Sequence, residues 1–143
     1  MARRRQRRRL RTAAIAEAVV LDAGALSAGA QGHVQVRAEL AIAEQLGARV
    51  HISSVTLAEV LRGHPRDARV HALLSGVDKD AVTPELGRFA GELLGRTARD
   101  DTVDAIVAVT AQSVGGRVRL LTGDPADLRS LTADMPGVTV VPI

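Results

Sequence analysis

Apolar residues occur along this chain in two alternating patterns. Short continuous apolar runs are typical of buried strands in a parallel sheet, and an apolar residue at every third or fourth position is typical of a helix. The expected strands are residues 18–21, 49–53, 80–82, 118–122 and 138–141. The expected helices are residues 33–46, 53 or 54 to 60, 67–74, 84–94, 102–114 and 124–134. Strands that alternate with helices predict an α/β fold with right-handed crossovers between parallel strands.

The first expected strand ends in a carboxylate, Asp22, which small residues 23–25 follow. Open α/β sheets build their sites at the carboxyl ends of their strands, so this position favours a functional role for Asp22. A helix N-cap or a turn is the structural alternative. The pattern assigns no helix to the stretch between this strand and residue 33.

Length and composition exclude several classes of protein. With 143 residues the chain is long enough for one domain with a sizeable core. Cysteine is absent, which excludes a disulfide framework, a thiolate metal site and a cysteine nucleophile. Phe89 is the only aromatic residue, so the core must be aliphatic, and we expect Phe89 to be buried in it. The sequence shows no apolar run of membrane-spanning length and no signal-peptide pattern, and we expect a cytoplasmic protein.

The charge is distributed unevenly between a basic arm, residues 1–16, and a folded domain, residues 17–143. The arm contains seven of the 19 basic residues and no acid, whereas residues 12–143 contain 12 basic and 16 acidic residues. Clustered like charges with little apolar surface predict a solvated, flexible segment. It could contact a phosphate backbone, serve as a solubilising tail, or be upstream sequence added by a misplaced start codon.

Four acids lie at the ends of the expected elements, namely Asp22, Glu59, Asp104 and Asp124. Each also has a structural explanation by itself. Glu59 fits a capping box whose N-cap is Thr56, and Asp124 fits an N-cap followed by a proline and a further acid, Asp127. Asp104 and Asp101 could complement the dipole of the helix that they begin. Asp104 fits this explanation less well, because it heads an apolar helix face on which a charge is costly.

The joint placement of these acids is more informative than any one of them. A parallel sheet with the first strand in its centre brings Asp22 and Asp124 to one edge, and flanking helices can present Glu59 and Asp104 over that edge. Converging carboxylates repel one another and raise some of their pKa values, a conflict that a divalent metal removes. Oxygen ligands without cysteine or suitably spaced histidine favour Mg²⁺ or Mn²⁺. Such a site suits phosphodiester hydrolysis, because the metal activates a water and stabilises the developing charge.

Four short motifs contain these acids. They are VVLDAGAL at 19–26, SVTLAEVLRG at 54–63, DTVDAIVA at 101–108 and LLTGDPADL at 120–128. With these motifs, in this order and spacing, the chain resembles PIN-domain ribonucleases, most of all the VapC-type toxins of toxin–antitoxin pairs. The resemblance covers about residues 17–143.

The resemblance implies a three-layer sandwich whose central parallel sheet of four to five strands has the order 3-2-1-4-5. It implies a Mg²⁺- or Mn²⁺-dependent endoribonuclease, usually a homodimer, that a cognate antitoxin inhibits near the acidic pocket. The catalytic acids then fall on Asp22, Glu59, Asp104 and Asp124, and the metal ligands on Asp22, Asp104 and Asp124. The supporting residues are Asp101, Asp127 and Thr122.

The chain departs from the family pattern at Gly24, where many members carry Ser or Thr. This departure keeps open a catalytically inactive PIN-like module that binds RNA or protein. An aspartate-based phosphoryl-transfer protein is disfavoured, because a dehalogenase-like phosphatase needs an acid at position 24 and a receiver domain needs a lysine better placed than Lys79.

The expected RNA contacts are arginines, because a single aromatic residue provides no stacking platform for bases. Arg62, Arg66 and Arg69 follow the helix that carries Glu59. A contact with RNA, a contact with an antitoxin and a simple solvated face remain open for these three.

Overall fold

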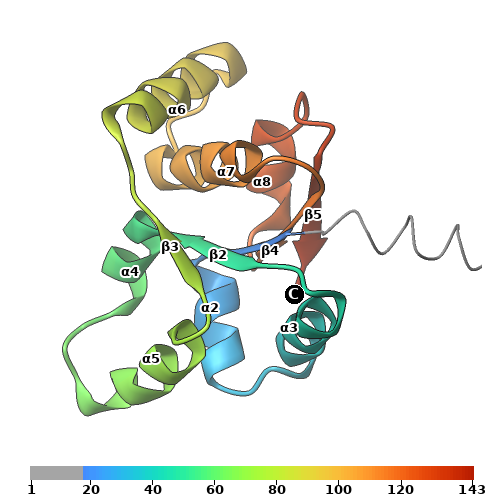
Figure 1. Ribbon diagram of the computed structural model, residues 1–143. Helices are drawn as coiled ribbons and strands as arrows, with labels where there is room; N and C mark the ends of the chain where they lie inside the picture. The colour runs from blue at the N-terminus through green and yellow to red at the C-terminus, as the bar shows by residue number, and fades with distance from the viewer. Residues whose placement is uncertain (1–17) are drawn as a thin grey trace, which may run out of the picture.

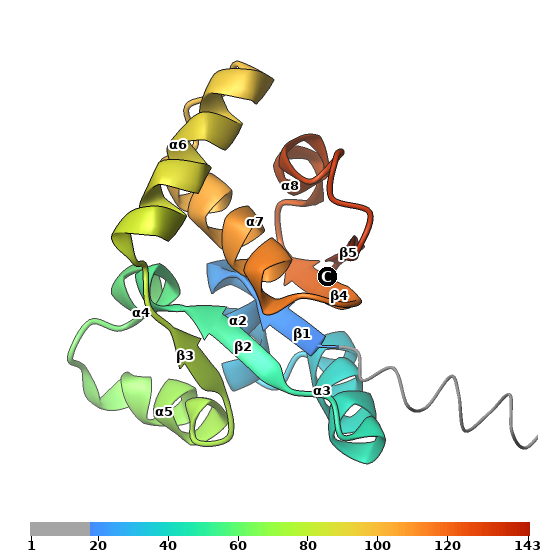
Figure 2. The ribbon, with the colours of Figure 1, turned by 45° about the horizontal axis from the view of Figure 1, so that its top comes forward.

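The sheet at the centre of the molecule has five parallel strands in the order β3-β2-β1-β4-β5. The structure is a computed structural model that describes residues 18–143, and the predicted arm therefore lies outside the described residues. The first strand lies in the centre of the sheet, as Figure 2 shows. The strands are β1 (Ala18–Leu21), β2 (Val50–Ser53), β3 (Asp78–Asp80), β4 (Val118–Thr122) and β5 (Val138–Pro142).

Helices cover both faces of this sheet, so the predicted three-layer sandwich is confirmed (Figure 1). On one face lie α6 (Pro84–Thr97), α7 (Thr102–Val114) and α8 (Pro125–Leu131). On the other lie α2 (Ala23–Ala30), α3 (Val34–Leu46) and α5 (Ala68–Leu74). The short α4 (Ser54–Val60) packs against both α2 and α7, and a single 3₁₀ turn, η1 (Pro65–Asp67), precedes α5.

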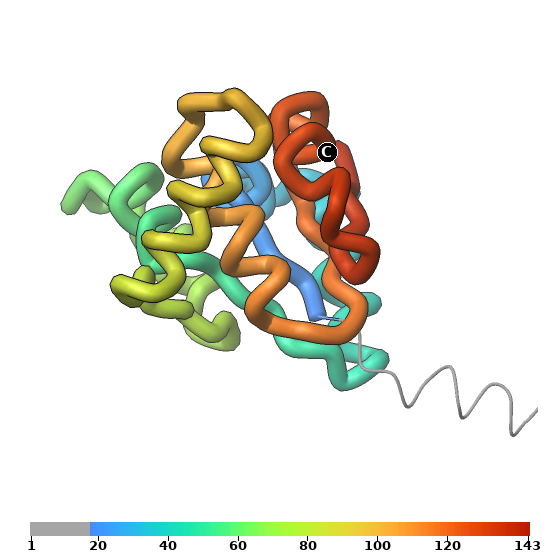
Figure 3. Tube along the Cα trace, turned by 90° about the horizontal axis from the view of Figure 1, so that it is seen from above, coloured from blue at the N-terminus to red at the C-terminus, as the bar shows by residue number. Residues whose placement is uncertain are grey.

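Alternate residues of β1 belong to two separate cores. Val20 packs with α6, α7 and α8, whereas Val19 and Leu21 pack with α2, α3 and α5. All three side chains are buried, which explains why the strand reads as a continuous apolar run. Figure 3 shows α7 crossing over β1, with α6 beside α7 on the outside.

One helix, α2, was missed because its sequence has no polar face. Ala25, Leu26, Gly29 and Ala30 are buried between the sheet and its neighbouring helices. A Cβ atom at Gly29 would lie 2.8 Å from Cγ1 of Val36, so glycine permits the close approach of α3. A helix that is apolar all round lacks the periodicity on which helix prediction depends.

The third strand is displaced from the predicted residues 80–82 to Asp78–Asp80, and its sequence is Asp-Lys-Asp. Polar side-chain contacts with β2 and with Arg49, the residue before it, take the place of an apolar pattern. Arg49 donates two hydrogen bonds of 2.6 Å to the carboxylate of Asp78, and Nδ1 of His51 lies 3.0 Å from Asp80. An edge strand of this kind gives no hydrophobic signal.

Other differences concern the helix ends and the aromatic residue. The helix α6 extends three residues beyond the predicted 94, and α8 ends at Leu131 rather than 134. The prediction that Phe89 is buried was wrong: its side chain is 42% exposed, and the guanidinium of Arg88 lies 5.2 Å from the ring centroid. Within residues 18–143 the structure has no helix with the length and apolar character needed to span a membrane.

Candidate active site

Asp22 follows the central strand and begins the next helix. Its backbone N–H donates to the carbonyl of Leu121 at 3.1 Å, which continues the pairing of β1 with β4. Its Oδ1 accepts a hydrogen bond of 2.8 Å from the N–H of Ala25, so the N-cap interpretation is correct. The cap uses one carboxylate oxygen and fixes the side chain, which is only 9% exposed, at the carboxyl end of the sheet.

Glu59 lies in the last turn of α4 and is exposed. The alternative that made it part of a capping box was wrong, because the N-cap is Ser53, whose Oγ accepts a hydrogen bond of 3.3 Å from the N–H of Val55. Partial burial raises the pKa of Glu59, and the charge of Asp22 raises it further, while Arg62 lowers it. Glu59 is therefore electrostatically coupled to Asp22, as the sequence predicted for two acids at one edge.

Asp104 is the point at which the acids meet. It lies in the first turn of α7, half-buried. Burial and then the charges of Asp101, Asp124, Asp127 and Asp22 raise the pKa of Asp104 to about 6. Stabilisation of the helix dipole would lower this pKa, so the dipole does not explain Asp104. The side chain instead sits in an excess of negative charge.

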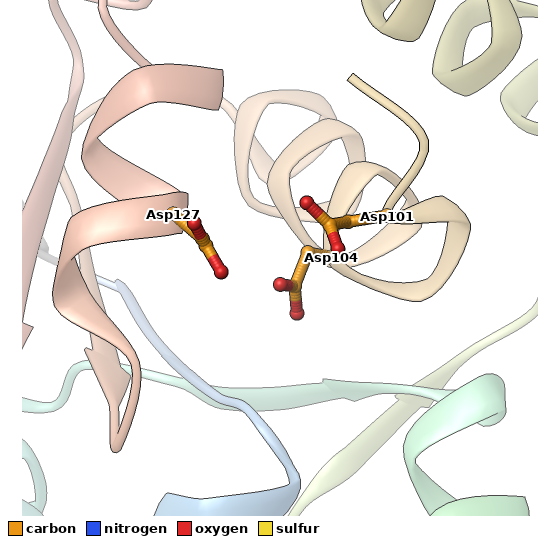
Figure 4. A group of neighbouring side chains, drawn as sticks. All are labelled: Asp101, Asp104 and Asp127. Carbon is orange, nitrogen blue, oxygen red and sulfur yellow. The ribbon is translucent and has the colours of Figure 1, made fainter.

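Asp101, Asp104 and Asp127 form a group of three carboxylates, in which one oxygen from each lies within 4.8 Å of the others. Figure 4 shows that Asp127 on α8 points across the gap toward Asp104 on α7, with Asp101 beside it. Sequence reasoning assigned only supporting roles to Asp101 and Asp127. Asp22 and Asp124 lie outside this group of three, and their role as metal ligands stays a prediction.

Arg99, which the sequence did not single out, contacts this group. Its Nη2 donates to Oδ2 of Asp101 at 2.8 Å and also to Oδ1 of Asp127. These hydrogen bonds raise the pKa of Arg99, and the contact with Arg99 lowers the pKa of Asp127. The only signal in the sequence is the position of Arg99 two residues before Asp101, and one arginine in an expected loop is not distinctive.

Asp124 occupies the N-cap position of α8, but its side chain forms no cap hydrogen bond, so the N-cap alternative fails here. Its backbone N–H donates to Oγ1 of Thr122 at 2.8 Å, and Thr122 is buried at the end of β4. A hydrogen bond with Asp127 is the largest of the effects that raise the pKa of Asp124. Thr122 therefore positions the loop, and the side chain of Asp124 is turned toward Asp127.

The arginines expected to contact RNA, Arg62, Arg66 and Arg69, all line one cavity of about 720 Å³ between α2, α4 and the start of α5. Asp67 organises the loop that carries them, because its Oδ2 accepts hydrogen bonds from the N–H groups of Arg62 at 2.8 Å and Gly63 at 2.7 Å. The charge of Arg62 also acts on Glu59. Through Arg62, the cavity is electrostatically coupled to Glu59.

The donor set fits a hard divalent cation. Six acids interact electrostatically near the carboxyl edge of the sheet, and Arg99 forms ion pairs with two of them, Asp101 and Asp127. Burial and the charges of neighbouring acids raise the pKa values of Glu59 and Asp104. Carboxylate oxygens are the ligands that Mg²⁺ and Mn²⁺ prefer. A bound ion would relieve the repulsion and would stabilise the ionised carboxylates.

Solved structures of similar fold come from toxin–antitoxin complexes. They include VapBC2 from Rickettsia felis bound to a DNA fragment from its promoter (TM-score 0.66, 15% identity, 87% of this chain and 98% of that chain). A toxin–antitoxin complex from Klebsiella pneumoniae is also similar (TM-score 0.65, 22% identity, 85% and 96% covered). A third is VapBC-5 from Mycobacterium tuberculosis (TM-score 0.55, 20% identity, 90% and 99% covered).

The search of curated proteins finds no match to this sequence. The PIN domain family model, in contrast, matches residues 19–131, which include every acid described above. The strand order and the layers are those that the resemblance implied. The chain belongs to the PIN domain family.

Proposed function

We propose that this PIN-domain protein is a metal-dependent endoribonuclease that hydrolyses RNA phosphodiester bonds and acts as the toxin of a toxin–antitoxin pair. One observation carries the proposal: burial, together with the charges of four other acids, raises the pKa of Asp104 to about 6. Repulsion between the ionised carboxylates does not stabilise the fold. A divalent cation gives the cluster a use, and the family membership supports nuclease chemistry.

Each acid has a distinct role in the proposed reaction. Asp22, Asp104 and Asp124 would hold Mg²⁺ or Mn²⁺, which activates a water and stabilises the charge that develops on the phosphate when bound. Glu59 is exposed at the rim and has a raised pKa, so its carboxylate is suited to take a proton from the attacking water. Asp101 and Asp127 form ion pairs with Arg99 and would have a supporting role beside the metal ligands. Thr122 holds the loop before Asp124 in place.

The family membership and the arginine-lined cavity support the proposed substrate and partners. Arg62, Arg66 and Arg69 offer positive charge beside Glu59, where an RNA backbone could be bound. The structural neighbours come from toxin–antitoxin complexes, which supports a cognate antitoxin as the physiological partner. We also propose that the protein is a homodimer and acts in the cytoplasm.

Gly24 supports a second candidate, a catalytically inactive module that binds RNA or a protein. Gly24 lies at the start of α2, and a Cβ atom built there would lie 3.5 Å from Oδ1 of Asp22 and 3.4 Å from the backbone N of Gly123. A serine or threonine at this position would place a hydroxyl beside Asp22. Without it the site lacks one group that could hold a metal-bound water.

Cleavage of a mixed RNA panel by the purified protein separates the two candidates. The reactions contain Mg²⁺, Mn²⁺ or EDTA, and the variants are Asp22→Asn and Asp104→Asn. Asp134→Asn, an exposed acid outside the cluster, serves as the matched control. We expect metal-dependent cleavage that only the control variant retains. A folded protein that neither cleaves RNA nor gains thermal stability with metal would reject the nuclease and favour the binding module.

A further inference from the structure

Arg99 is positioned by the turn that joins α6 to α7. The turn residue Ala98 has φ 53° and ψ 41°, a left-handed conformation that is uncommon outside glycine. The N–H of Arg99 donates to the carbonyl of Leu94 at 3.2 Å, which closes the end of α6. The backbone is thus fixed immediately before Arg99, and the side chain extends to the acids of α7 and α8.

The guanidinium of Arg99 uses one nitrogen for two carboxylates. Nη2 bridges Asp101 and Asp127, two of the three acids whose oxygens lie within 4.8 Å of one another. Within the described residues, the Nε of Arg99 is buried without a hydrogen-bond partner. The attraction between the guanidinium and the two carboxylates, rather than a full set of hydrogen bonds, therefore accounts for the position of the Arg99 side chain. The positively charged guanidinium of Arg99 therefore lies between Asp101 and Asp127.

We infer that Arg99 takes the place of a second metal ion, so that the site of this protein binds one divalent cation rather than two. The inference rests on the proposed function, because it assumes that the acids bind a metal. Asp101 and Asp127 are committed to the guanidinium, and a second divalent ion between them would be repelled by its positive charge. Asp22, Asp104 and Asp124, which form no ion pair with Arg99, remain for the single ion.

The number of Mn²⁺ ions bound per chain tests this inference. It can be measured by equilibrium dialysis with detection of free Mn²⁺ by electron paramagnetic resonance, without any substrate. Arg99→Gln and Arg99→Met remove the charge, Arg99→Lys keeps it, and Arg96→Gln removes an exposed arginine of the same segment as a matched control. We expect one ion for the wild type, Arg99→Lys and Arg96→Gln, and two ions for both neutral variants.

Other outcomes separate this inference from the proposed function. Two ions in the wild type, or one ion in a folded neutral variant, would overturn the role of Arg99 and leave the nuclease proposal intact. If neither neutral variant folds, Arg99 is needed for the fold rather than for the ion count, and the inference is overturned as well. A wild type that binds no Mn²⁺ would reject the metal-dependent function itself.

Discussion

Replacing Asp104 with asparagine should stabilise the metal-free protein at neutral pH. The pKa of Asp104 is raised from 3.8 to about 6, so the ionised carboxyl favours the unfolded state. A shift of about two pKa units corresponds to roughly 3 kcal/mol. Because the side chain is only half-buried, screening by solvent reduces this to about 1–2 kcal/mol. Asparagine removes the charge but keeps the shape.

The difference in stability between the wild type and Asp104→Asn should depend on pH in a definite direction. Below pH 3.8 the carboxyl of Asp104 is protonated in both states, so wild type and variant should be about equally stable there. As the pH rises from 4 to 6, the unfolded state releases the proton first, and the wild type loses stability relative to Asp104→Asn. Above the folded pKa of about 6 the difference should be constant. Mg²⁺ should reverse it, because the ion favours the ionised carboxylate.

Urea denaturation in EDTA at pH 4, 5, 6 and 7.5 measures this difference directly. The acids outside the cluster titrate alike in both proteins, so their contribution cancels in the comparison. Asp134→Asn should show no pH-dependent difference from the wild type. The reasoning would be refuted if Asp104→Asn were less stable than the wild type at pH 7.5 in EDTA, or if the difference did not depend on pH.

Three further predictions concern the residues that position the site. Ala98→Gly should stabilise the protein by roughly 0.5–1 kcal/mol in urea denaturation, because glycine adopts the left-handed turn without steric cost; an unchanged or lower stability would contradict this. Gly29→Ala should cost about 1–3 kcal/mol, because its Cβ would lie 2.8 Å from Cγ1 of the buried Val36, and a Tm equal to that of the wild type would exclude such tight packing. Asp67→Ala should lower the Tm, since its carboxylate accepts three backbone hydrogen bonds in the arginine loop; the loss should shrink at acid pH, where protonation weakens the same bonds in the wild type, and a loss independent of pH would argue against them.

Hydrophobic pattern predicted the fold wherever one side of an element is buried and the other exposed, or where a strand is buried throughout. The bounds of α7, β1 and β4 match the prediction for this reason. The pattern failed for α2, which packs between the sheet and three helices, α3, α4 and α5. It also failed for β3, an edge strand whose aspartates contact Arg49 and His51. In these two elements the neighbours in space, rather than the local sequence, determine the conformation.

The sequence by itself determined the α/β class and the identity of the acids at the ends of the elements, and its resemblance to the family implied the strand order. A residue that follows a strand closely lies at the carboxyl edge of the sheet, so the positions of Asp22 and Asp124 at this edge were predictable. Only the tertiary structure decided which acids touch, that Asp127 turns toward Asp104, and that Arg99 lies between Asp101 and Asp127. These contacts join α7, α8 and the loop before α7, and their distances depend on how the helices pack, which no local pattern encodes.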